Sequence, residues 1–232
     1  MMRKLTTFPL NSMLLCGVAY TTLTCCKDPA KLPPTASSVS HPAKIFSSYK
    51  GWAFGEQAYK HTEAIVNFGP RPIESEAHKK TQAYISSALK KHGWTVKKQE
   101  FISDTPYGKR KFTNIIARKN GADVSKTSSP DILLAAHYES KLLEGFVGAD
   151  DAASCIGALL EIAEFLPKVD PGFASRVELV FFDGEEALKK TIVPKKDGLY
   201  GSLYYSSYLN KDVTSTKSNY SKRPKFGILL AI

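Results

Sequence analysis

The chain has 232 residues, of which 43% are hydrophobic and 23% are charged, and it contains four cysteines. This composition excludes a disordered, a collagen-like or a disulfide-scaffold protein, because the apolar residues suffice to offset the entropy lost on folding. Lys and Arg outnumber Asp and Glu by 32 to 22, a formal net charge of +10, which fits a nucleic-acid partner, an anionic membrane or a soluble basic surface.

Residues 1–26 have the layout of an export signal. Two basic residues open the segment, a short apolar stretch follows, and the segment ends in Leu23-Thr24-Cys25-Cys26. This ending resembles the cleavage site of bacterial lipoproteins, so we expect a lipoprotein signal with Cys25 or Cys26 as the lipidated residue. The alternative is an ordinary signal peptide with incidental thiols. Either prediction gives an exported protein, held by lipid in the cell envelope or released as a periplasmic or extracellular protein.

A flexible tether is predicted between the signal and the folded domain. Residues 27–49 are rich in Pro, Ala and Ser and contain few large apolar residues, a composition typical of linkers. Residues 50–232 form the domain, without a repeat or an internal boundary. Its basic residues are scattered lysine pairs without a repeating aromatic platform, so we expect a soluble basic surface and no nucleic-acid partner.

Two helices and a hairpin are predicted at the start of the domain. Apolar residues recur at helical spacing over Trp52–Phe68 and Glu74–His92. Gly69-Pro70-Arg71-Pro72 separates these helices, because the prolines cannot continue a helix. Thr95–Ile102 alternates as a strand does, and Lys111–Ala117 is the predicted returning strand.

The rest of the domain alternates strands with helices. Asp131–Ala136 and Val177–Phe182 are apolar runs without alternation, as expected for strands covered on both faces. Ala152–Phe165 and Leu199–Leu209 are predicted helices, and Phe226–Ile232 is a further apolar, buried strand. This order predicts an α/β fold with a largely parallel sheet. Because the chain ends inside an apolar strand, we expect the fold to be incomplete at its C-terminus.

Polar clusters follow the buried elements at three points. His137-Tyr138-Glu139-Ser140-Lys141 follows the first core strand, Asp150-Asp151 opens the next helix, and Asp183-Gly184-Glu185-Glu186 follows the second core strand. Open α/β sheets bind ligands at the carboxyl ends of their strands. A histidine and several carboxylates there suit a divalent metal, and nitrogen with oxygen ligands favours zinc. Since adjacent residues point in different directions, one of Glu185 and Glu186 can hold a metal while the other carries protons.

Each cluster also has a purely structural explanation. His137 alone would fit a hydrogen-bonded core histidine, and Asp150 or Asp151 would fit a helix cap. Glu185-Glu186 would fit a solvated loop. Their occurrence together, each beside a strand end or a helix start, favours the metal site.

These motifs resemble those of the glutaminyl-peptide cyclotransferases, within the zinc aminopeptidase-like superfamily. The resemblance covers about residues 49–232 and implies a three-layer α/β/α fold around a mixed, largely parallel sheet, of which this chain holds the N-terminal portion. The loop Ala187–Gly198, inserted after the paired glutamates, is typical of the cyclotransferases rather than of the aminopeptidases. Four segments carry the resemblance: Phe181-Phe182-Asp183-Gly184-Glu185-Glu186-Ala187, His137-Tyr138-Glu139-Ser140-Lys141, Phe146-Val147-Gly148-Ala149-Asp150-Asp151 and Leu199-Tyr200-Gly201-Ser202.

The resemblance also implies the site residues. Asp151 and Glu186 match two ligands of a single zinc ion, and Glu185 matches the catalytic acid/base. The third ligand of the family is a distant downstream histidine, and no position of this chain matches it. His137 matches the position that binds a second metal in the two-zinc aminopeptidases. Glu139 stands where the family usually has Asp.

Three functions are compatible with these residues. The leading hypothesis is a zinc-dependent acyltransferase that closes the N-terminal Gln of peptides or proteins to pyroglutamate and releases ammonia. The second is a zinc aminopeptidase, in which His137, Asp151 and Glu186 hold two metals and Glu185 activates water. The third is a truncated chain without turnover, or a binding remnant, because one zinc ligand is missing. We expect a monomer.

Cys155 is the cysteine that lies outside the export segment. Because it has no partner in the domain, it is predicted to be a buried free thiol and to form no disulfide.

Overall fold

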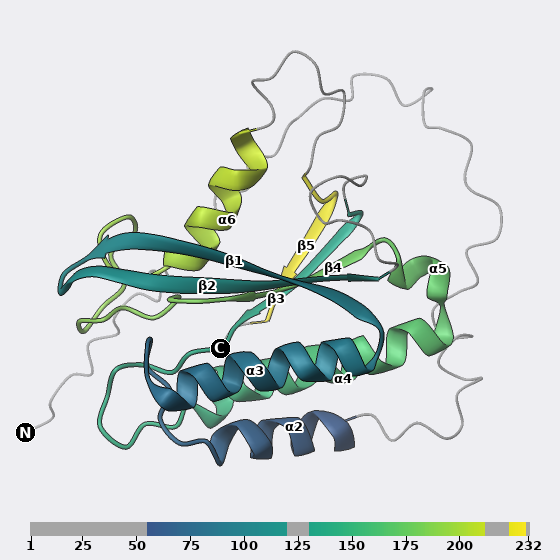
Figure 1. Cartoon of the computed structure of the whole chain (residues 1–232), viewed down its shortest axis with the longest axis horizontal. Helices are drawn as coiled ribbons and strands as arrows, with labels where there is room; N and C mark the ends of the chain where they lie inside the picture. The colour runs from purple at the N-terminus through teal and green to yellow at the C-terminus, as the bar shows by residue number, and fades with distance from the viewer. Residues whose placement is uncertain (1–54, 120–129, 212–222, 231–232) are drawn as a thin grey trace, which may run out of the picture. The chain divides into compact units, whose positions relative to one another are not determined.

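A mixed sheet of five strands forms the centre of the structure, a computed structural model that describes residues 55–119, 130–211 and 223–230 (Figure 1). The strands lie in the order β1-β2-β4-β3-β5. β3 pairs in parallel with β4 and β5, whereas β2 pairs antiparallel with β1 and β4. The sheet is therefore mixed, as predicted, with its parallel pairs on one side. The strands are β1 (Trp94–Thr105), β2 (Gly108–Lys119), β3 (Ile132–His137), β4 (Val177–Phe182) and β5 (Phe226–Leu229).

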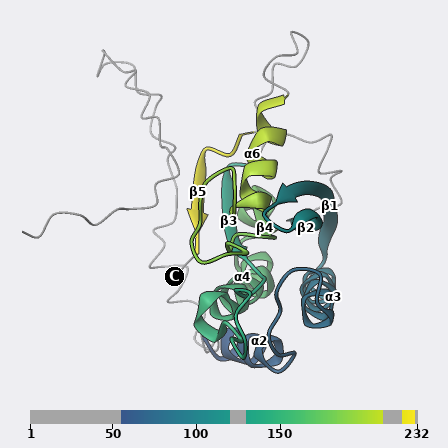
Figure 2. The ribbon, with the colours of Figure 1, turned by 90° about the vertical axis from the view of Figure 1, so that its left-hand side faces the viewer.

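Helices cover both faces of this sheet (Figures 1 and 2). α3 (Glu76–Lys91) and α4 (Cys155–Val169) lie on one face, and α2 (Glu56–Val66) packs against α4. α6 (Tyr200–Lys211) lies on the opposite face. Two short helices flank α4. η2 (Ala149–Ser154) precedes it, and α5 (Pro171–Ala174) follows it. The arrangement confirms the expected three layers.

β4 is buried on both of its faces. Val177, Leu179 and Phe181 pack with the side chains of the α3 and α4 layer, and Val180 and Phe182 pack on the α6 side. A strand with two buried faces shows no alternation of apolar and polar residues. For this reason the apolar run Val177–Phe182 predicted the strand with its observed bounds.

β5 contradicts one part of the prediction. The strand is present over Phe226–Leu229 and pairs with β3, but all four of its residues are exposed. The exposed fraction is 69% for Phe226 and 57% for Ile228. The prediction of a buried strand is wrong. An apolar side chain is buried only where another element packs against it, and composition alone does not show whether such an element is there.

The predicted export signal over residues 1–26 and the tether over residues 27–49 lie outside the described residues. The described residues belong to one compact unit, Ile45–Ile232. Within them, no helix is both long and apolar enough to cross a membrane. Cys155 is a free thiol with 6% of its surface exposed, which confirms that prediction for the described part of the chain.

Candidate active site

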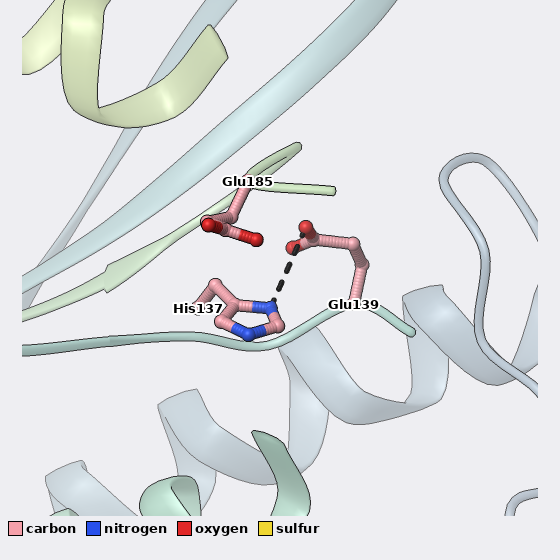
Figure 3. Close-up of side chains that lie close together, drawn as sticks. All are labelled: His137, Glu139 and Glu185. Carbon is pink, nitrogen blue, oxygen red and sulfur yellow. Dashed lines mark ion pairs between the residues drawn. The ribbon is translucent and has the colours of Figure 1, made fainter. Parts of the chain in front are cut away.

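The candidate active site lies at the carboxyl ends of β3 and β4. His137, the last residue of β3, is in register with Phe182, the last residue of β4. Because these strands are parallel, the segments that leave them meet at the same edge of the sheet. His137, Glu139 and Glu185 each bring one nitrogen or oxygen atom there, and these atoms lie within 4.8 Å of one another (Figure 3). We call these three residues the compact group.

His137 is held between two carboxylates. Its Nε2 lies 2.8 Å from Oδ1 of Asp151, and its Nδ1 lies 3.6 Å from Oε1 of Glu139. Burial by itself lowers the pKa of His137, but the charge of Glu139 and the hydrogen bond with Asp151 raise it well above its usual value. The two carboxylates therefore favour the protonated form of His137, whose charge offsets part of theirs.

Two buried atoms of the compact group have no hydrogen-bond partner within the described residues. They are Nδ1 of His137 and Oε2 of Glu139. A buried polar atom without a partner costs free energy, so such an atom needs an explanation. A nitrogen and an oxygen donor, with the carboxylate of Glu185 beside them, are ligand types that zinc prefers. The residues present therefore fit a divalent cation.

Glu185 is the half-buried carboxylate of the compact group. Burial raises its pKa to about 7, although the charge of His137 opposes this rise. The turn that carries it is held by α6, because the backbone oxygens of residues 183–185 each accept a hydrogen bond at 2.8 Å from the backbone of residues 199–201. A carboxylate that is fixed in place and titrates near neutral pH suits proton transfer.

Asp151 and Glu186, the two predicted zinc ligands, border the compact group. Asp151 contacts it through His137. The carboxylate of Glu186 lies 2.9 Å from Nζ of Lys141, and its backbone N donates to Oε1 of Glu139 at 3.0 Å. The four predicted site residues thus lie at one end of the sheet, and the assignment of Asp151 and Glu186 as ligands stays a prediction.

The backbone explains the orientation of Asp151. Asp151 and Ala152 have non-helical φ and ψ angles, so the chain is kinked where η2 leads into α4. The residue at the N-cap position of η2 is Gly148, which makes no side-chain capping bond. The carboxylate of Asp151 faces His137 at this point, which favours the site over the helix-cap explanation.

Glu139 is the member of the compact group to which the sequence assigned no function of its own. It is 1% exposed and lies two residues after His137. Side chains at positions i and i+2 of an extended segment share a face. The His-x-Glu spacing at the end of a buried strand was therefore the signal that could have identified it.

Arg71, between α2 and α3, binds both ends of the loop that connects β3 with η2. Its side chain is fully buried and donates hydrogen bonds to the backbone oxygens of Tyr138, Val147 and Gly148. Burial lowers its pKa to about 10, so it stays charged at neutral pH. The sequence placed Arg71 only in a helix break. Its partners are 67 to 77 residues away in the chain, and no local pattern reports contacts of that kind.

Asp183 anchors the start of the turn that carries Glu185. Its Oδ1 lies 2.9 Å from Nε2 of His78 in α3, and its Oδ2 accepts a hydrogen bond from the backbone N of Thr113 in β2 at 2.7 Å. The ring of His78 stacks on Tyr138 with ring centroids 5.0 Å apart. The position of Glu185 therefore depends on α3, β2 and α6 together.

The similarity of this chain to known proteins agrees with the site. Residues 114–221 match Peptidase family M28. Over 181 residues the chain is 29% identical to a glutaminyl-peptide cyclotransferase of Dictyostelium discoideum, an alignment that covers 71% of this chain and 49% of that protein. The resemblance that the motifs carry is thereby confirmed, and the chain spans about half the length of this relative.

Two solved structures share the fold. A Macrostomum lignano glutaminyl cyclase is 28% identical with a TM-score of 0.62, and the match covers 77% of this chain and 56% of that one. A Zn-dependent exopeptidase from Parabacteroides distasonis is 29% identical with a TM-score of 0.58, covering 75% of this chain and 60% of that one. The same fold thus occurs in a glutaminyl cyclase and in a Zn-dependent exopeptidase.

Proposed function

We propose that this chain, which carries a Peptidase family M28 region and resembles the glutaminyl-peptide cyclotransferases, is a zinc-dependent acyltransferase that closes N-terminal Gln to pyroglutamate. The observation that carries the proposal is the position of Glu185. Its carboxylate has a pKa near 7 and lies within 4.8 Å of the buried donors of His137 and Glu139. Glu185 can therefore carry a proton beside the donor atoms of His137 and Glu139, which suit a cation.

The proposed reaction exchanges one bond to nitrogen for another. The α-amine of the substrate attacks the carbon of its own side-chain amide, a C–N bond forms, and the bond to the amide nitrogen breaks as ammonia leaves. Glu185 takes the proton of the attacking amine and returns it to the leaving nitrogen, so its charge is restored at the end. A carboxylate pKa near 7 serves both steps. Because the nucleophile is already part of the substrate, the site has mainly to hold a compact conformer.

Asp151 and Glu186 would hold the zinc ion, and the unpartnered donor atoms of His137 and Glu139 would complete its site. Polarisation of the amide carbonyl is the chemistry that a bound zinc ion supplies. Lys141, 2.9 Å from Glu186, keeps that carboxylate neutralised when no cation is present. Arg71 holds the loop that follows β3. Asp183 holds the start of the turn that carries Glu185.

An assay with two substrates tests the proposal. The full chain, loaded with zinc, is incubated with a Gln-peptide and with a Leu-arylamide. We expect the Gln-peptide to lose one ammonia, detected by mass spectrometry and by coupled ammonia assay, without cleavage of its peptide bonds. Release of free arylamine from the Leu substrate, without ammonia from the Gln-peptide, would contradict the cyclisation.

A zinc aminopeptidase is the second candidate. It is favoured by His137, which occupies the position of a second-metal ligand in that branch and lies inside the compact group. In that case Glu185 would activate a water molecule in place of the substrate amine. The Leu-arylamide in the same assay measures this activity directly.

Zinc is expected to stabilise the folded protein. Zinc at about 100 times its dissociation constant should raise the free energy of unfolding by about 2.7 kcal/mol, because only the folded state presents the assembled site. Thermal and urea unfolding with and without zinc, and after EDTA, measure the effect.

Ligand variants identify where the zinc binds. Asp151→Asn and Glu186→Gln are each expected to weaken zinc binding by more than about tenfold, whereas Glu144→Gln, at an exposed carboxylate of the neighbouring loop, should not. Equal stabilisation of all three variants would place the zinc at another site.

A further inference from the structure

A groove of about 560 Å³ adjoins the candidate active site. The two are continuous, because Lys141 lines the groove while its Nζ lies 2.9 Å from the carboxylate of Glu186. Leu188, two residues after Glu186, forms another part of the wall. A chain that leaves the site on this side would therefore enter the groove. The lining residues are Tyr107, Lys141, Leu142, Leu143, Leu188, Lys189 and Lys190.

The walls of the groove present apolar side chains to solvent. The exposed fraction is 53% for Tyr107, 54% for Leu142 and 61% for Leu143. Tyr107 comes from the turn between β1 and β2, whereas the two leucines come from the loop after β3. Large apolar side chains that gather around a concave surface are typical of binding sites.

One side of the groove is held in place by a buried carboxylate. Asp197 is 3% exposed, and its two oxygens accept hydrogen bonds from the backbone N atoms of Leu188 and Lys189, both at 2.9 Å. The hydroxyl of Tyr200 also donates to Asp197, at 3.1 Å. These bonds fix the backbone of the wall without any ligand. A wall that is already ordered lowers the entropy cost of binding.

The groove is positively charged. Lys189 and Lys190 are exposed, and neither forms an ion pair with a carboxylate in the part of the chain that the structure describes. Lys141 is paired with Glu186 at the inner end of the groove. The two outer lysines therefore leave a positive potential that favours an anionic ligand.

Resting on the proposed function, we propose that this groove binds the part of the substrate peptide that follows its N-terminal Gln, and that it selects peptides with acidic side chains at the next positions. An extended peptide advances by about 3.3 Å per residue, so the residues after the first leave the site one after another. Apolar side chains contact Leu142 and Leu143, and acidic side chains pair with Lys189 and Lys190. Loop Ala187–Gly198 thus determines specificity.

Exposed leucines beside lysines would also suit an anionic membrane surface. Two observations favour a peptide. The surface is concave, and it is continuous with the candidate active site through Lys141. A membrane would contact a protruding surface better than a recessed one.

Three peptides test the preference in the full chain loaded with zinc. They are Gln-Ala-Glu-Glu, Gln-Ala-Gln-Gln and Gln-Ala-Lys-Lys, and Gln-amide serves as a substrate without a following chain. We expect kcat/KM for the acidic peptide to exceed that for the basic peptide by about tenfold, since two weak exposed ion pairs favour the first and two like-charge contacts disfavour the second. The ratio should fall as salt is raised, because these charges are exposed. Equal values for the acidic and basic peptides would overturn the proposal.

Two charge-reversal variants locate the effect. Lys189→Glu combined with Lys190→Glu is expected to reverse the preference, so that the basic peptide becomes the better substrate. The matched control is Lys195→Glu combined with Lys196→Glu, an exposed pair in the same loop that does not line the groove, and it should keep the wild-type ratio. An unchanged preference in the first variant would overturn the proposal.

Failure of the proposed function can be separated from failure of the groove. If Gln-amide gives no ammonia, the proposed cyclisation is wrong. The groove is then tested by the dissociation constants of fluorescently labelled acidic and basic peptides. A tenfold difference that depends on Lys189 and Lys190 supports peptide binding in the groove, and equal constants overturn it. Binding to phosphatidylserine vesicles that depends on the same two lysines, without discrimination between the peptides, would overturn it in favour of a membrane surface.

Discussion

Replacement of Glu185 by Gln is expected to lower the rate of ammonia release from Gln-peptides by about 10²–10⁴-fold. The amide has nearly the size of the carboxylate but cannot take a proton from the attacking amine. Burial raises the pKa of Glu185 to about 7, so at neutral pH the carboxylate can accept a proton and release it in the same catalytic cycle. Steady-state kcat and KM for Gln-amide measure the loss, which should fall mainly on kcat.

The Glu185→Gln protein is expected to remain folded. In the metal-free protein, the raised pKa means that ionising Glu185 costs stability as the pH rises from about 4.5 to about 7. At pH 8 the Gln variant should therefore be at least as stable as the wild type in urea unfolding. Glu144→Gln, at an exposed carboxylate, is the matched control and should keep the wild-type rate. A rate for Glu185→Gln within tenfold of wild type would contradict the assigned role.

Replacement of Arg71 by Met is expected to lower the free energy of unfolding by about 3–5 kcal/mol. The variant removes the donors of the backbone oxygens of Tyr138, Val147 and Gly148, of which the first and the last are in buried hydrogen bonds. Each oxygen left without a donor costs about 1–3 kcal/mol of stability. Relaxation of the loop, which lets water reach these oxygens, reduces the total. Urea unfolding followed by the fluorescence of Trp94, which is 2% exposed, measures the change.

Two further variants calibrate this result. Arg71→Lys keeps the positive charge but loses the planar fork of donors, so we expect a loss of intermediate size. This variant also provides a measurement if Arg71→Met does not fold. Arg110→Met, which removes an exposed arginine paired with Glu74 at 3.3 Å, should cost less than about 1 kcal/mol. A loss below about 1 kcal/mol for Arg71→Met would show that Arg71 does not hold the loop between β3 and η2 in place.

The elements that the sequence predicted best are those whose burial is complete. The run Val177–Phe182 coincides with β4 because both faces of that strand are covered. Phe226–Ile232 has the same apolar composition, yet β5 is exposed along its described length. Composition distinguishes a strand from a loop, but the exposure of a strand depends on what packs beside it.

Some residues of the candidate site could also be predicted from the sequence, whereas others could not. His137, Asp151, Glu185 and Glu186 could be found from the chain because each lies beside a strand end or a helix start, where ligands bind in sheets of this class. The His-x-Glu spacing places Glu139 beside His137, but the approach of Glu185 to both follows from the parallel pairing of β3 with β4, which no short window of sequence shows. The groove beside Lys141 required the turn between β1 and β2 to approach the loop after β3.

By itself, the sequence determined the α/β fold class, the order of the strands and helices, and the polar clusters that carry the chemistry. These properties depend on local periodicity and on residue type at neighbouring positions. Only the tertiary structure decided that Arg71 and Asp183 hold the site together, that Glu185 is buried enough to titrate near pH 7, and that lysines line a groove beside it. Those properties depend on contacts between residues far apart in the chain, which exist only once the helices have packed on the sheet.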